Sequence, residues 1–395
     1  METISKTLIT LGAIFLLGLA VEYIGRKTRL PRVTLLLVLG ILIGPSALDV
    51  LPRLIYEEWF TFITDIALGM VGFLLGEKLL FSILKENAKT VLAISIGEVL
   101  VTSVLVFTGL FLIGVSVEMS LILAGIATAT APAATMDVVQ ETGAQGPFTT
   151  ILLEIVAIDD AWGLIVFSFL LAMAHSLHTN AGGAAILLSG SWELGGALLL
   201  GIALGIPMAF LTGRLRFGEP MLIEALGFLF LCTGIALWME VSFLLASIVM
   251  GAVVANMAQH HKYPFHAIKE IESPFLILFF LLAGASLQLE SLGQVGTIGL
   301  VYIIFRVLGR ISGAWIGGTL CDSPTEIKNW MGLALMPQAG VALGMALVAN
   351  QEFPKYGVYI FPLIIGTTVF FELTGPILTR VALTRSGELL NKKNN

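Results

Sequence analysis

Two adjacent carboxylates, Asp159 and Asp160, lie near the middle of an apolar stretch that runs from about Pro147 to His175. A helix of that length, at ~1.5 Å per residue, could cross a hydrocarbon core about 30 Å thick. An ionised side chain at that depth costs at least a few kcal/mol, so a buried charge there is a functional hypothesis by default. Two such charges side by side predict a site that uses them.

Three further charged residues lie within other apolar stretches. Glu98 is one, and Arg306 and Arg310 are four residues apart and therefore share one helix face. If all five groups share one cavity, three carboxylates face two guanidiniums and one negative charge is left over. In a medium of low dielectric, a proton or a metal cation must neutralise it. We therefore expect an exchange site, where a carboxylate is stable when protonated or cation-bound and unstable when empty.

The other charged residues could instead have purely structural roles. Arg306 and Arg310 could each form a static ion pair that holds two helices together. A neighbouring helix could supply the partner of Glu98 without any role for Glu98 in transport. Glu154 lies five residues before Asp159, about 140° around the helix at ~100° per residue, so a packing role is favoured. Glu372 lies nearer one end of its stretch, and a structural role is favoured there too.

Two apolar stretches are interrupted where a helix should be continuous. The first contains Pro132 within residues 127–135, and the second contains Pro337 within residues 335–341. Proline removes a backbone hydrogen bond and clashes with the preceding turn. Unwound backbone at membrane depth is tolerated only where it lines a cavity or is buried in protein. The residues that we expect at these breaks are Thr128, Thr130, Pro132, Pro337, Gln338 and Gly340.

A matched pair of interrupted helices indicates an inverted-repeat transporter, although a single proline kink is often innocent. Residues 89–175 and 292–385 would hold the two repeats of the core, each with its broken helix second. The sequence has no cluster of His and Cys that would favour a transition metal. Threonine hydroxyls and freed carbonyls favour a hard monovalent cation, Na⁺ or Li⁺. The aspartates and the threonines of the first break are therefore the candidate ligands, and no cofactor is expected.

Composition places the chain in the membrane. Of its 395 residues, 57% are hydrophobic and only 12% are charged, whereas soluble domains carry about a quarter charged residues. We expect an all-α polytopic protein of about thirteen membrane spans, and a net charge of −6 argues against nucleic acid as a partner. The expected spans are 5–24, 32–51, 59–80, 89–115, 118–141, 147–174, 192–213, 219–239, 242–259, 268–288, 294–319, 328–350 and 356–381, with a loop at 176–191.

The distribution of Lys and Arg predicts the orientation. Sixteen of them fall in the loops and tail on one side of these spans, and only Lys6, Arg53 and Lys355 fall on the other. Positive charge collects on the cytoplasmic side. We therefore expect the N-terminus outside, the C-terminus in the cytoplasm, and residues 386–395 as a cytoplasmic tail.

The ordered set of motifs resembles the bacterial and archaeal monovalent cation:proton antiporters, particularly the NapA/NhaA-like branch. The resemblance covers essentially the whole chain. It rests on Ala157-Ile158-Asp159-Asp160, Ala129-Thr130-Ala131-Pro132, Met336-Pro337-Gln338-Ala339-Gly340 and Gly309-Arg310. Ala131 stands where relatives carry aspartate, which Glu98 could replace. Arginine stands where some relatives carry a lysine proposed to transport a proton, and arginine keeps its proton. The proton stoichiometry is therefore open.

The resemblance implies crossed broken helices, alternating access by an elevator-like movement, and homodimers in a prokaryotic cell membrane. Residues 1–88 and 176–291 would form the dimer or scaffold domain against which the core moves. Asp160 would bind the cation and the proton in turn. Asp159 would pair with Arg310 when the site is occupied, and Thr130 would offer a hydroxyl or a carbonyl oxygen.

Other functions remain as alternatives. A potassium/proton antiporter of the Kef type shares this core but usually adds a cytoplasmic regulatory domain, for which about fourteen residues after the last span leave no room. A bile-acid-type sodium symporter would not need a central Asp-Asp pair. An intramembrane aspartyl protease, the one enzyme considered, needs two carboxylates that face each other from separate helices, whereas adjacent residues point about 100° apart.

Overall fold

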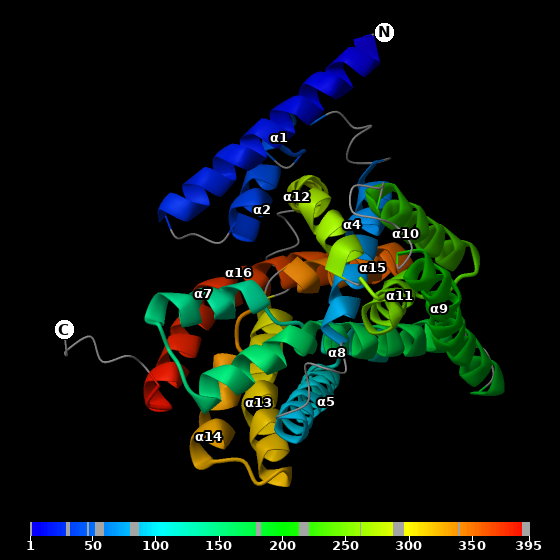
Figure 1. The fold of residues 1–395 in the computed structure, drawn as a ribbon. Coiled ribbons are helices and arrows are strands. Elements are labelled where there is room, and N and C mark those ends of the chain that lie inside the picture. The colour runs from blue at the N-terminus through cyan, green and yellow to red at the C-terminus, as the bar shows by residue number, and fades with distance from the viewer. Residues whose placement is uncertain are drawn as a thin grey trace.

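The computed structural model describes residues 2–28, 32–45, 47–51, 59–79, 87–178, 183–212, 221–260, 262–286, 296–338 and 340–388. Within these residues all the regular elements are helical (Figure 1). The helices are α1 (Glu2–Thr28), α2 (Arg32–Ile43), α4 (Trp59–Gly76), η1 (Glu77–Leu79), α5 (Ala88–Leu112), α6 (Val117–Ile126), α7 (Pro132–Thr142), α8 (Pro147–His178), α9 (Gly183–Thr212), α10 (Met221–Trp238), α11 (Phe243–Met257), α12 (Lys262–Ala285), α13 (Gly296–Leu320), α14 (Thr325–Ala334), α15 (Gly340–Glu352) and α16 (Pro354–Arg385).

The chain is a multi-pass membrane protein by the length and composition of its helices. Among the described helices, seven are long and apolar enough to cross a bilayer: α1, α5, α8, α9, α10, α13 and α16. Three shorter apolar helices are α2, α6 and α11. Each expected span corresponds to one helix or to a pair of half-helices, but thirteen crossings stay a prediction. The expected loop at 176–191 is wrong in its extent, because α8 continues to His178 and α9 already begins at Gly183. The Gly and Ala residues that suggested a loop are tolerated in this helix.

Both expected helix breaks are present. α6 ends at Ile126 and α7 begins at Pro132, while α14 ends at Ala334 and α15 begins at Gly340. Proline is favoured at the first helical position, where its missing N–H is not needed, so Pro132 opens α7. Each half-helix has ten to thirteen residues, too few to cross the hydrocarbon core alone.

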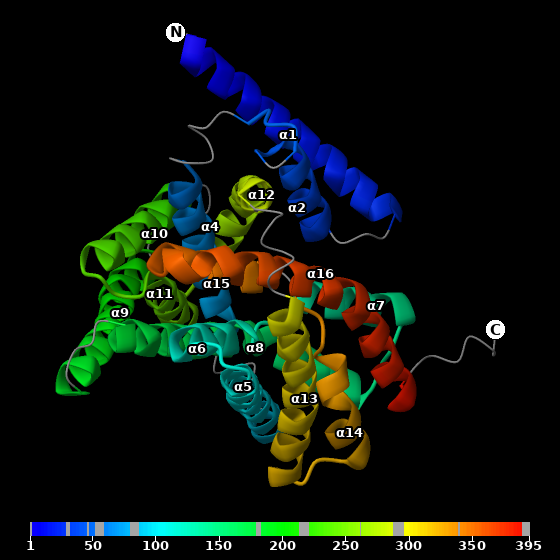
Figure 2. The same ribbon diagram turned by 180° about the vertical axis from the view of Figure 1, so that it is seen from behind.

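The long helix α8 crosses the middle of the molecule (Figures 1 and 2). α5 and α13 pack along each other below it in both views, and α9 and α11 pack against α8. α16 packs on α14 and α15, and α1 and α2 lie on the far side, with α2 against α12. α8 therefore contacts both the segments expected to form the core and those expected to form the scaffold.

Glycines allow α5 and α13 to approach closely. Gly309, Gly313 and Gly317 recur every four residues on α13, and a Cβ on Gly313 would lie 2.6 Å from the Cα of Glu98. A Cβ on Gly309 would likewise lie 2.5 Å from the Cα of Thr102. Small residues at this spacing let two membrane helices pack backbone to backbone. This packing sets Glu98 beside Arg310.

Candidate functional site

The two adjacent aspartates of α8 have different partners. Asp159 is fully buried, with Oδ2 3.0 Å from Arg310 Nη1 and Oδ1 accepting a hydrogen bond of 3.0 Å from Ser95 Oγ. Asp160 is 2% exposed, and its Oδ1 accepts from both the backbone N–H (3.1 Å) and the hydroxyl (3.0 Å) of Thr130. Consecutive side chains point about 100° apart on a helix. One carboxylate therefore faces an arginine and the other faces the first helix break.

Arg310 ties three segments together. Its Nη1 contacts Glu98 Oε1 on α5 as well as Asp159 on α8. Its Nη2 donates to the backbone carbonyls of Thr128, Ala129 (3.0 Å) and Ala127 (3.3 Å) in the first break. Glu98, Asp159 and Arg310 are all fully buried. The expected pairing of Asp159 with Arg310 is thus present in this conformation, while its dependence on a bound ion is a matter for experiment.

Arg306 bridges the two helix breaks. It donates to Ala127 O (3.1 Å) and Ala129 O (2.9 Å) in the first break and to Met336 O (3.0 Å) in the second. Its guanidinium also lies 4.1 Å from the centre of the Phe371 ring. These carbonyls follow the C-terminal ends of α6 and α14, which carry the negative end of the helix dipole. Because the described hydrogen bonds of Arg306 go to carbonyls, Glu98 and Asp159 share Arg310 as their cationic partner in the described contacts.

The remaining expected break residues divide into two groups. Thr128 contributes its carbonyl to Arg310, and Gln338 Nε2 donates to Ile126 O (3.4 Å), so both belong to the junction of the breaks. Pro132 shapes the break as the first residue of α7. Pro337 instead packs on α16, where a Cβ on Gly375 would lie 2.6 Å from its Cα, and Gly340 lies against the Phe280 ring of α12. These last two residues position the backbone, and the described contacts do not connect them to a carboxylate.

Three residues at the site were not predicted from the sequence. Ser95 binds Asp159, the Tyr302 hydroxyl accepts from Gln338 Nε2 (3.1 Å), and Phe371 covers Arg306. Ser95 lies three residues before Glu98 and Tyr302 four residues before Arg306, so each shares a helix face with a buried charge. That spacing is the signal that could have identified the first two.

Two other carboxylates lie apart from the site, as their positions suggested. Asn87 Nδ2 donates to Glu154 at 3.1 Å, which joins the starting turn of α5 to α8. Glu372 on α16 accepts a hydrogen bond from the hydroxyl of Thr34 on α2. Both contacts connect helices, in agreement with the structural role expected for them.

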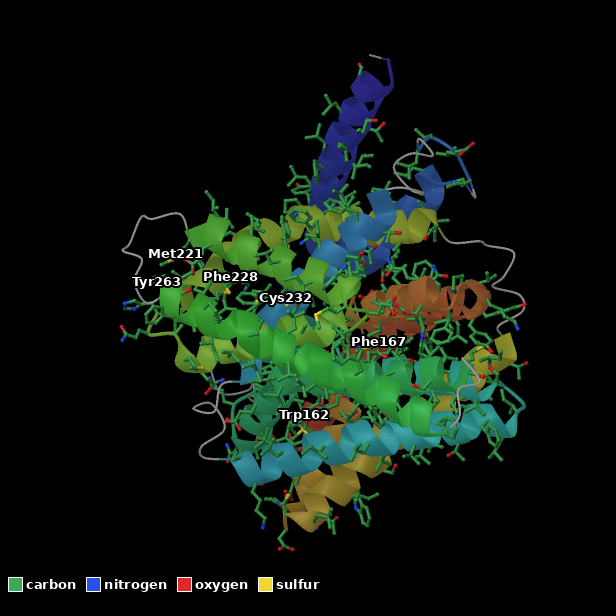
Figure 3. All side chains as sticks on the ribbon, turned by 90° about the vertical axis from the view of Figure 1, so that its right-hand side faces the viewer. Trp162, Phe167, Met221, Phe228, Cys232 and Tyr263 are labelled. Carbon is green, nitrogen blue, oxygen red and sulfur yellow. The ribbon has the colours of Figure 1, made fainter. Side chains whose placement is uncertain are left out.

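A cavity of about 480 Å³ lies beyond the C-terminal half of α8. Its walls include Phe167 and His175 of α8, Glu193 of α9 and Glu352 of α15, and the side chains of His175 and Glu352 are about half exposed. Figure 3 labels Trp162 and Phe167 of α8, and Phe228 and Cys232 of α10. Phe167 is seven residues from Asp160, about two helical turns. The cavity thus lies about 10 Å or more from the aspartate along the helix axis, on the side expected to face outside.

Comparison with known proteins identifies the family of the chain. Residues 12–384 match the family model described as sodium/hydrogen exchanger, transmembrane. The ammonium/H⁺ antiporter subunit AmhT of Alkalihalophilus pseudofirmus is 22% identical over 88% of this chain and 84% of its own. The probable Na⁺/H⁺ antiporter 2 of Methanocaldococcus jannaschii is 25% identical, over 95% and 92%. The K⁺/H⁺ antiporter subunit KhtU of Bacillus subtilis is 24% identical, over 96% and 94%.

The fold is also similar to a solved structure, that of the sodium proton antiporter MjNhaP1 from Methanocaldococcus jannaschii at pH 8. The TM-score is 0.78 at 23% identity, covering 99% of this chain and 100% of the other. The family match spans nearly all of the described helices. The chain therefore belongs to the sodium/hydrogen exchanger family of the monovalent cation:proton antiporter superfamily.

Proposed function

We propose that this protein is a secondary active antiporter that exchanges cytoplasmic Na⁺ or Li⁺ for external protons, with Asp160 binding the cation and the proton in turn. The observation that carries the proposal is the unequal partnering of the two aspartates. Asp159 has the Arg310 guanidinium, whereas the hydrogen bonds described for Asp160 come from Thr130 alone. A buried carboxylate without a cationic partner is unfavourable when ionised. A proton or a small cation at Asp160 removes that penalty.

The first helix break supplies suitable further ligands. Thr130 places a hydroxyl oxygen beside Asp160, and Asp159 follows on the same helix as a second candidate. Hard monovalent cations are coordinated by oxygen atoms of this kind at unwound helices in transporters. A shift of Asp159 toward the cation would loosen its contact with Arg310. Glu98 then remains as the partner of Arg310, so the arginine is not left unpaired.

The arrangement of the two groups of helices supports alternating access. The core helices α5–α8 and α13–α16 hold every charged residue of the site, while the remaining helices form the scaffold of an expected homodimer. An elevator-like movement of the core would carry Asp160 from one side to the other. The cavity that reaches Phe167 supports a route from the outside, in the orientation that the loop charges predict for a prokaryotic cell membrane.

The identity of the cation has a competing answer. Relatives of comparable similarity are named for ammonium and for potassium, so an NH₄⁺/H⁺ or K⁺/H⁺ antiporter is the alternative. The site oxygens described above suit each of these monovalent ions in charge, and size would select among them.

The test is transport by the purified protein in vesicles that hold a pH gradient and a pH-sensitive dye. Na⁺, Li⁺, K⁺ and NH₄⁺ are added separately, with choline as control, with and without a clamped membrane potential. We expect Na⁺ and Li⁺ to release protons from vesicles that contain the wild type. Vesicles with Asp160→Asn should not respond, because the side chain at position 160 is then fixed as neutral. Equal proton release by the Asp160→Asn variant would disprove its role. Release by K⁺ or NH₄⁺ alone would favour the alternative, and dependence on the clamp would show net charge movement.

A further inference from the structure

The chain after α16 returns to the beginning of α8, the helix that carries both aspartates. α16 ends at Arg385, and Gly387, with φ of +79°, turns the backbone back toward the core. The carboxylate of Glu388 then accepts from the backbone N–H groups of Phe148 (2.7 Å) and Thr149 (2.8 Å). It also accepts from the Thr149 hydroxyl (2.7 Å). One side chain from the end of the described chain thus binds three donors in the first turn of α8.

Glycines on both segments make room for this contact, one directly before α8 and one directly before Glu388. Gly146, directly before α8, has φ of +152°, and a Cβ there would lie 2.4 Å from the Glu388 carboxyl carbon. A side chain at position 146 would therefore occupy the place of the carboxylate. The backbone N–H of Gln145 donates to the carbonyl of Glu388 at 3.3 Å and holds the segment that follows α16 in place. Gly387 supplies the left-handed turn that other residues rarely adopt.

The contact is favourable because a helix leaves its first N–H groups without partners inside the helix. An acidic side chain there satisfies those donors and interacts with the positive end of the helix dipole. α8 has no acidic residue in its own first turn, so Glu388 supplies this interaction from 240 residues away.

The last turns of α16 also contact the neighbouring half-helix α14. Thr379 Oγ1 donates to Ala334 O at the end of α14 (2.9 Å), and the Arg385 guanidinium lies 5.8 Å from the Trp330 ring. Glu388 therefore connects α8 of the first repeat to an end of α16 that is already anchored in the second repeat. We call the contact of Glu388 with Phe148 and Thr149 the tail clasp.

We propose that Glu388 is a positioning residue for the ion site: the tail clasp fixes α8 along its axis, and so holds Asp160 at Thr130. The inference rests on the proposed function. Asp160 lies twelve residues beyond Phe148, about 18 Å along a stiff helix, so an axial shift at the start of α8 reaches the carboxylate. The hydrogen bonds of Asp160 are 3.0 and 3.1 Å long, and a displacement of about 1 Å would break them.

The test compares Glu388→Ala, Glu388→Gln and Gly146→Ala with the wild type in the vesicle assay, measuring the cation concentration for half-maximal rate and the maximal rate. Loss of a helix cap corresponds to about twofold to thirtyfold in an equilibrium constant. We expect Glu388→Ala to raise the half-saturating concentration at least about threefold, with a smaller change in the maximal rate. Gly146→Ala should do the same without removing any charge. Glu388→Gln, which keeps one acceptor oxygen, should fall between.

The matched control is Glu326→Ala, which removes an exposed carboxylate from the first turn of α14 at the same end of the core. It should leave the half-saturating concentration unchanged. A Glu388→Ala protein that melts earlier but keeps wild-type half-saturation would show a merely structural cap and overturn the proposal. If Glu388→Ala does not fold, the same comparison is made with Glu388→Gln, and unchanged half-saturation there overturns it. A wild type without cation-triggered proton release would instead refute the proposed function.

Discussion

At the scale of single residues, the chemistry depends on which oxygen or nitrogen each buried charge can reach. Arg310 meets Glu98 and Asp159 with one nitrogen and three backbone carbonyls with the other. Arg306 donates its described hydrogen bonds to carbonyls of both breaks. Among the described residues, Asp160 accepts its hydrogen bonds from one threonine. The charges that hold the core together are therefore distinct from the charge proposed to meet the ion.

Arg310→Ala should destabilise the protein severely. Removing one partner of a buried ion pair leaves an uncompensated charge and costs about 3–5 kcal/mol, and here both Glu98 and Asp159 lose their partner. The melting temperature in detergent measures the effect. Arg380→Ala is the control, because its contact with Glu141 is exposed and long at 4.0 Å. A melting temperature equal to the wild type for Arg310→Ala would contradict the pairing.

Thr130→Val should weaken cation binding more than it weakens folding. The substitution keeps the shape of the side chain but removes the hydroxyl from Asp160, and a hydrogen bond to a charged group contributes about 1.5–3 kcal/mol. We expect the half-saturating cation concentration to rise by about tenfold or more. Thr130→Ser retains the hydroxyl and should stay close to the wild type. Equal behaviour of the two variants would exclude the hydroxyl as a ligand.

At the scale of elements, close packing decides whether the charges meet at all. α5 and α13 are in contact through their backbones at three glycines of α13, and this contact positions Glu98 beside Arg310. The two breaks meet because α6 and α14 stop short and leave carbonyls free for one arginine. The site is therefore a property of α5, α8 and α13 together with the two unwound segments.

Gly313→Ala should separate α5 from α13. Its Cβ would lie 2.6 Å from the Cα of Glu98, and such overpacking costs about 1–3 kcal/mol. Gly299→Ala on the same helix is the matched control, because a Cβ there has nothing within 4 Å and alanine favours the helix. We expect a lower melting temperature and slower transport for Gly313→Ala only. Equal melting temperatures would show that the close approach is unimportant.

The central aspartates and the two helix breaks could be predicted from the sequence, whereas other parts of the site could not. Charges and prolines inside apolar stretches are rare, so Asp159, Asp160 and the two breaks stand out. Ser95 does not, because a serine in an apolar helix usually bonds to its own backbone. Glu388 could not be found either, since its role depends on the turn at Gly387 and on a partner 240 residues away. The start of α9 was misplaced because small residues suggest a loop when their burial is unknown.

At the scale of the whole molecule, one described hydrogen bond joins the proposed core to the proposed scaffold at a buried carboxylate. Thr34 of α2 donates to Glu372 of α16, which is 5% exposed. An elevator-like movement of the core would break this contact, so the contact favours the conformation seen here. Its strength sets part of the balance between the two end states.

Thr34→Val should lower the population of this conformation. A lost hydrogen bond of about 1 kcal/mol changes a two-state ratio by about fivefold. Spin labels at two exposed positions, Leu42 on α2 and Ile377 on α16, report the distribution of distances between core and scaffold. The fraction of molecules with the label distance of this conformation should fall in Thr34→Val and in Glu372→Leu. It should fall no further in the double variant. Additive effects would mean that the two residues act independently.

The division between Asp159 and Asp160 has a consequence for how such proteins diversify. The aspartate anchored by arginine secures the framework, and its neighbour faces a short unwound segment that contributes the hydroxyl of Thr130. A change of ion preference then needs only new oxygen positions around residue 130, leaving the anchored half intact. One scaffold could in this way serve sodium, potassium or ammonium in different descendants without ever passing through an unfolded ancestor.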